Sequence, residues 1–209
     1  MKLNLKSLLA TIKDAWNYIF PIKRILNKFR TISSPEQLES YIQERSAHVT
    51  QTTLYGYLKT RIGTRYAMMF EDKVFSQSIN IAKWNIYIAA VSDCTLFTIS
   101  YLISEKNYKA NEAKKIFFSI LENEKKNGLE EKLIEEAKIE FQQRLKEVNW
   151  FNYYKENPFK KSGMALYKWS PIADELKVLD KEIVLNSIML KWNLVKNEFK
   201  ELTINLKFK

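Results

Sequence analysis

The longest apolar run in the chain, residues 75–103, constrains the fold more than any other feature of the sequence. Lys83 and Asp93 are the only charged residues in it. Residues 86–103 would just reach across a bilayer, but inserting Asp93 near their centre would cost about 2.5–3.5 kcal/mol. A helix surrounded by other helices is also apolar nearly all round. We therefore expect a central helix over about residues 72–104, and the alternative is a membrane span over residues 86–103.

Residues that form turns are scarce in this chain. Its 209 residues include four glycines and four prolines, and 46% of them are hydrophobic. A strand-rich fold needs many turn residues, and a disordered chain has fewer apolar side chains. The composition therefore predicts an all-α protein, a helical bundle around one long central apolar helix, with an N-terminal amphipathic helix.

A specific start signal precedes the central run. Ser34 and Gln37 form a capping-box pattern around Pro35, a residue suited to the first helical position. The helix that begins there is expected to end before Gly63. Gly56, inside the same helix, predicts a close crossing with another helix, because glycine is otherwise costly there.

Two charged helices are expected after the central run. Residues 109–126 and 129–148 carry apolar side chains at helical spacing and a charged outer surface, which is typical of a solvated helical hairpin. Glu140 precedes Arg144 by four residues, a favourable order for an ion pair on that outer surface. A last helix opens near Pro171. The apolar residues that it is expected to carry are Ile172, Leu176, Leu179, Ile183, Leu190, Leu194 and Phe199.

We divide the chain into three segments. Residues 1–30 form a basic amphipathic N-terminal helix, and residues 34–149 form a helical core domain. Residues 150–209 form an aromatic-rich loop, a C-terminal helix and an extended tail. Pro158 and Gly163 are expected to preclude one uninterrupted regular helix in the aromatic-rich part.

The net charge of +10 is concentrated at the N-terminus, where Asp14 is the only acidic residue among the first thirty. Such asymmetry indicates an anionic partner, either a membrane surface or a nucleic acid. The pattern favours a helix at an anionic membrane or on a partner, with Trp16, Lys23 and Arg24 as candidate contacts. Packing on the chain's own core and a cleaved targeting segment are the alternatives.

The sequence offers few groups for chemistry. One cysteine, Cys94, excludes an internal disulfide, and one histidine, His48, excludes a paired-histidine metal site. The nucleotide-binding glycine motifs are absent. We predict no catalytic residue, no cofactor and no metal. The alternative is an enzyme with a cavity near Asp93, His48 or Cys94.

If Asp93 is buried, its negative charge needs a positively charged partner. Basic residues lie within or beside the two longest core helices, and an Asp–Arg pair is the expected solution. We predict a structural polar cluster of Arg45, His48 and Asp93.

Aromatic and lysine residues are interleaved over residues 150–169. This pattern is typical of a protein interface, and base-stacking surfaces share it. We predict an interface, with nucleic acid as the alternative partner. The candidate residues are Trp150, Tyr153, Tyr154, Phe159, Tyr167 and Trp169.

The stretch SAHVTQTTLYGYLKTRIGTRYAMMFEDKVFSQSINIAKW, followed by SDCTLF, resembles an uncharacterised family of small helical proteins of alphaproteobacterial type. The resemblance covers about residues 34–104. That family has no established activity, so the resemblance implies no catalytic residue. It implies a bacterial cytoplasm or a setting on the matrix side of a mitochondrial membrane.

These patterns predict a non-catalytic helical accessory or adaptor subunit of a larger, membrane-associated assembly. A mitochondrial or bacterial energy-transducing complex is one such setting. The expected partners are other protein subunits and an anionic membrane surface. The expected location is the matrix side of the mitochondrial inner membrane, or the bacterial cytoplasm at the inner membrane. An RNA-associated or ribosome accessory protein and an enzyme are the alternatives.

Overall fold

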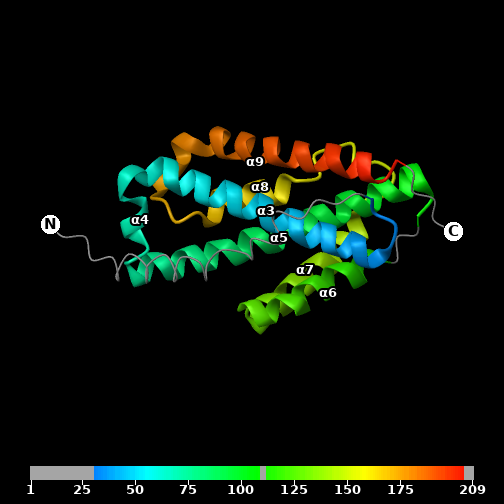
Figure 1. The fold of residues 1–209 in the computed structure, drawn as a ribbon, viewed down its shortest axis with the longest axis horizontal. Helices are drawn as coiled ribbons and strands as arrows, with labels where there is room; N and C mark the ends of the chain where they lie inside the picture. Colours follow the sequence, from blue (N-terminus) through cyan, green and yellow to red (C-terminus); the bar gives the residue numbers. More distant parts are fainter. Residues whose placement is uncertain (1–30, 109–111, 205–209) are drawn as a thin grey trace.

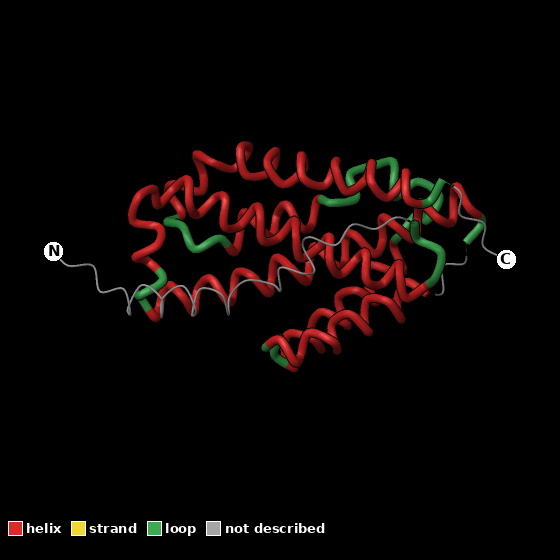
Figure 2. Tube along the Cα trace, in the orientation of Figure 1, coloured by secondary structure: helices red, strands yellow, loops and turns green. Residues whose placement is uncertain are grey.

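The computed structural model describes residues 31–108 and 112–204, and all regular secondary structure within those ranges is helical (Figures 1 and 2). The described helices pack together around one long apolar helix, so the predicted all-α bundle is confirmed. The expected N-terminal amphipathic helix, residues 1–30, lies outside the described residues.

The first described helix, α3 (Pro35–Ile62), begins and ends where its signals predict. The Ser34 hydroxyl accepts a hydrogen bond from the Gln37 backbone N–H at 3.3 Å. The Gln37 side-chain oxygen accepts from the Ser33 N–H at 2.7 Å, one residue earlier than a capping box requires. Gly63 follows the helix with a φ of 64°, a left-handed value that a glycine adopts without strain.

The apolar run forms α5 (Lys73–Lys106), which a 3₁₀ turn (Gly63–Arg65) and the short α4 (Tyr66–Met69) join to α3. The carboxylate of Asp72 caps α5 by accepting from Val74 N–H at 2.8 Å and Phe75 N–H at 3.2 Å. This helix is long and apolar enough to cross a membrane, and 89% of its most apolar window is buried inside the bundle. It packs against α3, α6 and α8, as expected of a central helix.

The expected hairpin consists of α6 (Glu112–Glu124), a 3₁₀ turn (Lys125–Asn127) and α7 (Glu131–Glu147). The rings of Phe117 and Phe141 stack at 4.0 Å between the two helices. On the outer surface, the Lys138 ammonium lies 2.5 Å from a Glu122 carboxylate oxygen. The hairpin therefore has one packed side and one charged side.

No single helix spans residues 150–169, so that expectation is confirmed, although Gly163 does not contribute to the interruption; the expectation about Gly56 is wrong. Gly163 lies inside α8 (Lys160–Trp169) and does not interrupt it. A Cβ there would meet Leu185 at 3.2 Å and Ile188 at 3.6 Å, so Gly163 permits the close approach of α8 to α9 (Asp174–Leu202). A Cβ on Gly56 would meet nothing within 4 Å, so the close crossing expected there does not exist.

The last helix, α9, buries Phe199 of its predicted apolar residues and leaves most of the others on its outer side. It lies along the upper edge of Figure 1 and packs on α3 and α8. Its inner face joins the same hydrophobic core as residues 32–166. The expected tail is partly helical, since α9 includes Leu202, and residues 205–209 lie outside the described part. The buried residues of α9 are Asp180, Val184, Ile188, Trp192, Val195 and Phe199.

Candidate functional site

The charge inside the central helix is buried and paired. The Asp93 side chain is fully buried, and one of its oxygens accepts a hydrogen bond from an Arg144 guanidinium N–H at 2.8 Å. Its other oxygen accepts from the Ser162 backbone N–H at 2.7 Å. Both carboxylate oxygens therefore face donors, an arrangement that accommodates the ionised form.

Asp93 also caps α8 from another helix. Phe159, the residue before α8, has no side chain that can accept a hydrogen bond, and Ser162 is the third residue of the helix. The Asp93 carboxylate takes over that role and places negative charge at the N-terminus of α8, where the helix dipole favours it. This contact fixes α8 relative to α5.

Arg144 joins this pair to the loop after α7. Its guanidinium also donates to the Ser92 hydroxyl at 2.5 Å and to the Tyr153 hydroxyl oxygen at 2.8 Å. The Tyr153 hydroxyl donates in turn to the Pro158 carbonyl at 2.9 Å. Burial raises the pKa of Asp93, and the Arg144 cation and the Ser162 hydrogen bonds oppose that rise.

The expected buried Asp–Arg pair is confirmed, but its arginine is Arg144 on α7 and not a residue within or beside the two longest helices, and the expected Glu140–Arg144 pair is wrong. Arg45 does not join Asp93: its guanidinium donates to both carboxylate oxygens of Glu198, at 2.6 and 2.7 Å. Glu140 does not pair with Arg144; it lies 2.5 Å from the Lys161 ammonium. Arg45 and Asp93 therefore belong to two separate ion pairs. The predicted cluster of Arg45, His48 and Asp93 does not form.

A third ion pair ties the far end of α3 to α9. The carboxylate of Asp180 is paired with the Arg61 guanidinium, and it accepts a hydrogen bond from the Tyr57 hydroxyl at 2.8 Å. Together with Arg45 and Glu198, these contacts hold α9 against α3 at both ends.

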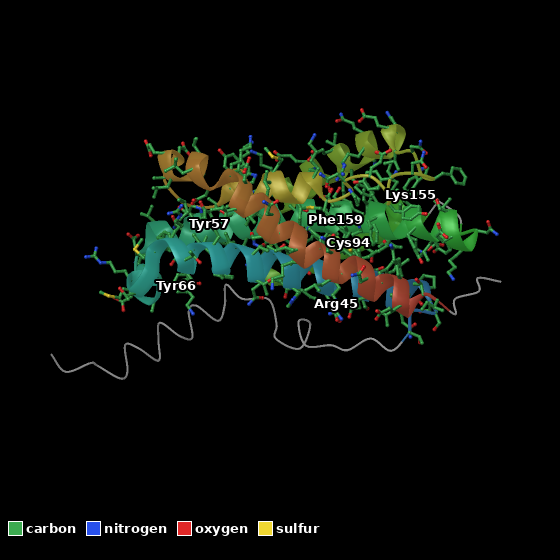
Figure 3. All side chains as sticks on the ribbon, turned by 90° about the horizontal axis from the view of Figure 1, so that it is seen from above. Arg45, Tyr57, Tyr66, Cys94, Lys155 and Phe159 are labelled. Carbon is green, nitrogen blue, oxygen red and sulfur yellow. The ribbon has the colours of Figure 1, made fainter. Side chains whose placement is uncertain are left out.

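Cys94 is fully buried on α5 (Figure 3). Burial raises the pKa of its thiol far above the usual value. A catalytic cysteine requires the thiolate, so the protonated and buried Cys94 is unsuited to nucleophilic chemistry. Burial, with Arg45 and Lys191 nearby, lowers the pKa of His48 and keeps it neutral.

An open pocket of about 380 Å³ lies beside the Asp93–Arg144 pair. Its basic wall consists of Arg144, Lys160 and Lys161. Asp93 and Glu140 neutralise Arg144 and Lys161 respectively, which leaves Lys160 as the one charge of this wall without an acidic partner among the described residues. Two of the three cations in this wall are therefore neutralised by acidic residues.

Three exposed carboxylates on the hairpin, Glu122, Glu131 and Glu135, place oxygens within 4.8 Å of one another. Two ammonium groups lie among them. Lys125 contacts Glu131 at 2.7 Å, and Lys138 contacts Glu135 at 2.7 Å. These cations occupy the place that a metal ion would need, so the cluster is a surface ion-pair network.

Most of the aromatic residues expected at an interface help to form the core. Phe159 is fully buried, and it stacks on Trp192 with ring centroids 4.2 Å apart. Tyr154 is 8% exposed, and its backbone N–H donates to the Ser100 hydroxyl at 3.1 Å. Trp150, Tyr153 and Tyr167 are half-buried. Trp169 is 37% exposed, while Trp16, Lys23 and Arg24 lie outside the described residues.

The last helix exposes one apolar surface. Five of the aliphatic residues that the sequence places on this helix lie on the outer side of α9, and four of them are 65–76% exposed. We call these five residues the outer row. Exposed apolar residues gathered on one side of a helix are typical of interaction sites on soluble proteins. The outer row consists of Leu176, Leu179, Ile183, Leu190 and Leu194.

No protein-family model, no curated protein and no solved structure matches this chain. The resemblance of residues 34–104 to a family of small helical proteins therefore stays a prediction.

Proposed function

We propose that this chain is a non-catalytic helical accessory or adaptor subunit that works through contact with other polypeptides. The observation that carries this proposal is the outer row of α9. Removing the five aliphatic side chains of this row from water lowers the free energy, so a second polypeptide that covers them is stabilised there. The outer row is the contact surface in this proposal.

The state of the titratable groups supports a role without catalysis. Asp93 is held between Arg144 and the Ser162 amide, and Cys94 is buried and protonated. An acid–base catalyst has to reach its substrate and exchange a proton with it. Groups engaged in this way stabilise a fixed helix arrangement instead.

The setting that we propose is a membrane-associated assembly. Asp14 is the only acidic residue among the first thirty, so that segment has a strong positive charge, which favours an anionic lipid surface. A location on the matrix side of the mitochondrial inner membrane, or at the bacterial inner membrane, agrees with this charge. RNA binding is less favoured, because stacking on bases needs exposed rings and Phe159 and Tyr154 are buried.

The test is the size of the native assembly after the outer row is made polar. The full-length chain would carry Ile183→Asn and Leu190→Asn, whose side chains are 68% and 66% exposed. We expect the assembly recovered from native membranes to lose mass, while the melting temperature of the purified chain, measured at protein concentrations low enough for a monomer, stays the same.

The matched control carries Val178→Asn and Ile139→Asn, which are 67% and 60% exposed and lie outside the outer row. The control should keep the full assembly. An assembly of unchanged size in the outer-row variant would contradict the proposal. Ordered RNA that remains after a high-salt wash would favour the alternative, because most RNA binding weakens steeply with salt.

A further inference from the structure

The outer row extends along most of α9. From Leu176 to Leu194 it would measure about 27 Å, at 1.5 Å per residue. Leu179 is 76% exposed and Ile183 is 68% exposed, so the middle of the row is as open as a side chain on a lone helix. Figure 1 shows α9 at the edge of the bundle with no described helix on its outer side.

Building on the proposed function, we infer that the polypeptide covering the outer row is a second copy of this chain, bound with its α9 antiparallel. The two-fold axis would pass beside Asn186 and Ser187. A two-fold interface uses the same surface on both partners, so that surface has to be complementary to itself.

The spacing of the outer row meets that requirement. When Asn197, which follows the outer row on the same side of the helix, is counted with its five residues, successive positions are separated by 3, 4, 7, 4 and 3 residues, a series that reads the same in both directions. In an antiparallel pair, Leu179 therefore faces Leu194 of the second copy, and Ile183 faces Leu190. Each of the central aliphatic residues meets another aliphatic residue.

The charges beside the row favour the antiparallel direction. Positions 175, 182, 193 and 200 lie on one edge of the row, because steps of 7 and 18 residues return to nearly the same side of an α-helix. Glu175 and Glu182 occupy the first half of this edge, and Asn193 and Lys200 occupy the second. The antiparallel arrangement sets Glu175 against Lys200 of the second copy, and antiparallel helix dipoles attract.

The polar residues at the centre would fix the register. Asn186 and Ser187 lie between Ile183 and Leu190, where the row is interrupted. The two-fold axis places Asn186 against Ser187 of the second copy. A polar residue at the centre of a helix pair specifies its register at some cost in stability. Sliding one helix by a turn would set both residues against aliphatic side chains.

A lipid surface fits the outer row less well. Helices that lie in a membrane interface carry Lys or Arg along the polar face and aromatic residues on the apolar face. The outer row contains only Leu and Ile, and acidic Glu175 and Glu182 lie on its edge.

The test uses two single-cysteine additions to the full chain, Leu179→Cys and Leu194→Cys. The native thiol of Cys94 is fully buried and does not interfere. Under mild oxidation we expect the mixture of the two variants to form a disulfide-linked dimer at least about tenfold faster than either variant alone. Faster cross-linking of each variant with itself would overturn the antiparallel arrangement.

Light scattering on the purified chain gives the second measurement. We expect twice the 24.8 kDa mass of one chain. The Ile183→Asn and Leu190→Asn variant should have the mass of one chain, and the Val178→Asn and Ile139→Asn control should remain a dimer.

These measurements separate the two proposals. If the wild-type chain is a monomer but its native assembly still loses mass when the outer row is made polar, the proposal of a second copy is wrong. The proposed function then stands. A dimer that is also the entire native species supports the second copy and contradicts the accessory subunit.

Discussion

Both α5 and α9 carry apolar residues on more than one side, but the bundle covers them differently. Other helices surround α5, and 89% of its most apolar window is buried. The bundle covers only one face of α9, where Ile188 and Trp192 are fully buried, while Leu179 on the outer side is 76% exposed. An apolar helix face in the sequence therefore indicates a surface that favours contact with other protein. The position of the helix in the bundle decides whether the same chain provides that contact.

The largest effect should come from the covered helix. Asp93→Asn replaces one carboxylate oxygen by an amide donor that faces either the Arg144 guanidinium or the Ser162 N–H. We expect the free energy of unfolding to fall by about 3–5 kcal/mol, as for other buried ion pairs that lose one partner. Urea denaturation followed by circular dichroism measures this change.

The control for that prediction is Asp174→Asn in the first turn of α9, where the side chain is 93% exposed. Its urea midpoint should match that of the wild type. An Asp93→Asn chain as stable as this control would mean that the pair contributes nothing to the covered helix.

A smaller effect should distinguish the two faces of α9. Ile188→Ala empties a fully buried position and should cost about 2–5 kcal/mol. Ile183→Ala, at a position that is 68% exposed, should cost within about 0.5 kcal/mol at protein concentrations low enough for a monomer. Thermal unfolding at several concentrations checks both values. Equal costs at every concentration would mean that the chain itself covers the outer row.

The smallest effect concerns the contact between α3 and α9. Burial, Arg45 and Lys191 lower the pKa of His48 below 6.5, and Glu198 opposes them. Below that pH the unfolded chain binds a proton that the folded chain resists, so the free energy of unfolding should fall with the pH.

His48→Gln should remove this contribution and flatten the dependence below about pH 6.5. Denaturation midpoints across that range give the comparison. Identical slopes for the variant and the wild type would show that His48 titrates alike in both states.

Local signals in the sequence predicted the helices well. Ser34 and Asp72 cap α3 and α5 where their positions indicate, because a cap depends on residues within one turn. The central place of α5 also followed from its composition, since few charges interrupt its apolar run.

Contacts between distant residues were not predictable in this way. Arg144 reaches Asp93 across 51 residues, and the helical pattern of α7 placed it on the solvated side beside Glu140. The face of α9 that is buried was not predictable for a related reason. Its buried face includes Asp180, which the Arg61 pair makes tolerable, so the outer row was the more uniformly apolar face.

The cap that Asp93 provides to α8 has a consequence for the order of folding. At 10 residues, α8 is shorter than the roughly 12–15 residues at which isolated helices become even marginally stable, and no cap of its own precedes it. Its N-terminal hydrogen bond comes from a residue 69 positions earlier in the chain. Closing that loop costs entropy before the contact forms, so α8 should appear late, after α5 and α7 have met. Refolding would then end with a single cooperative step that sets α8 and the inner face of α9 in place together.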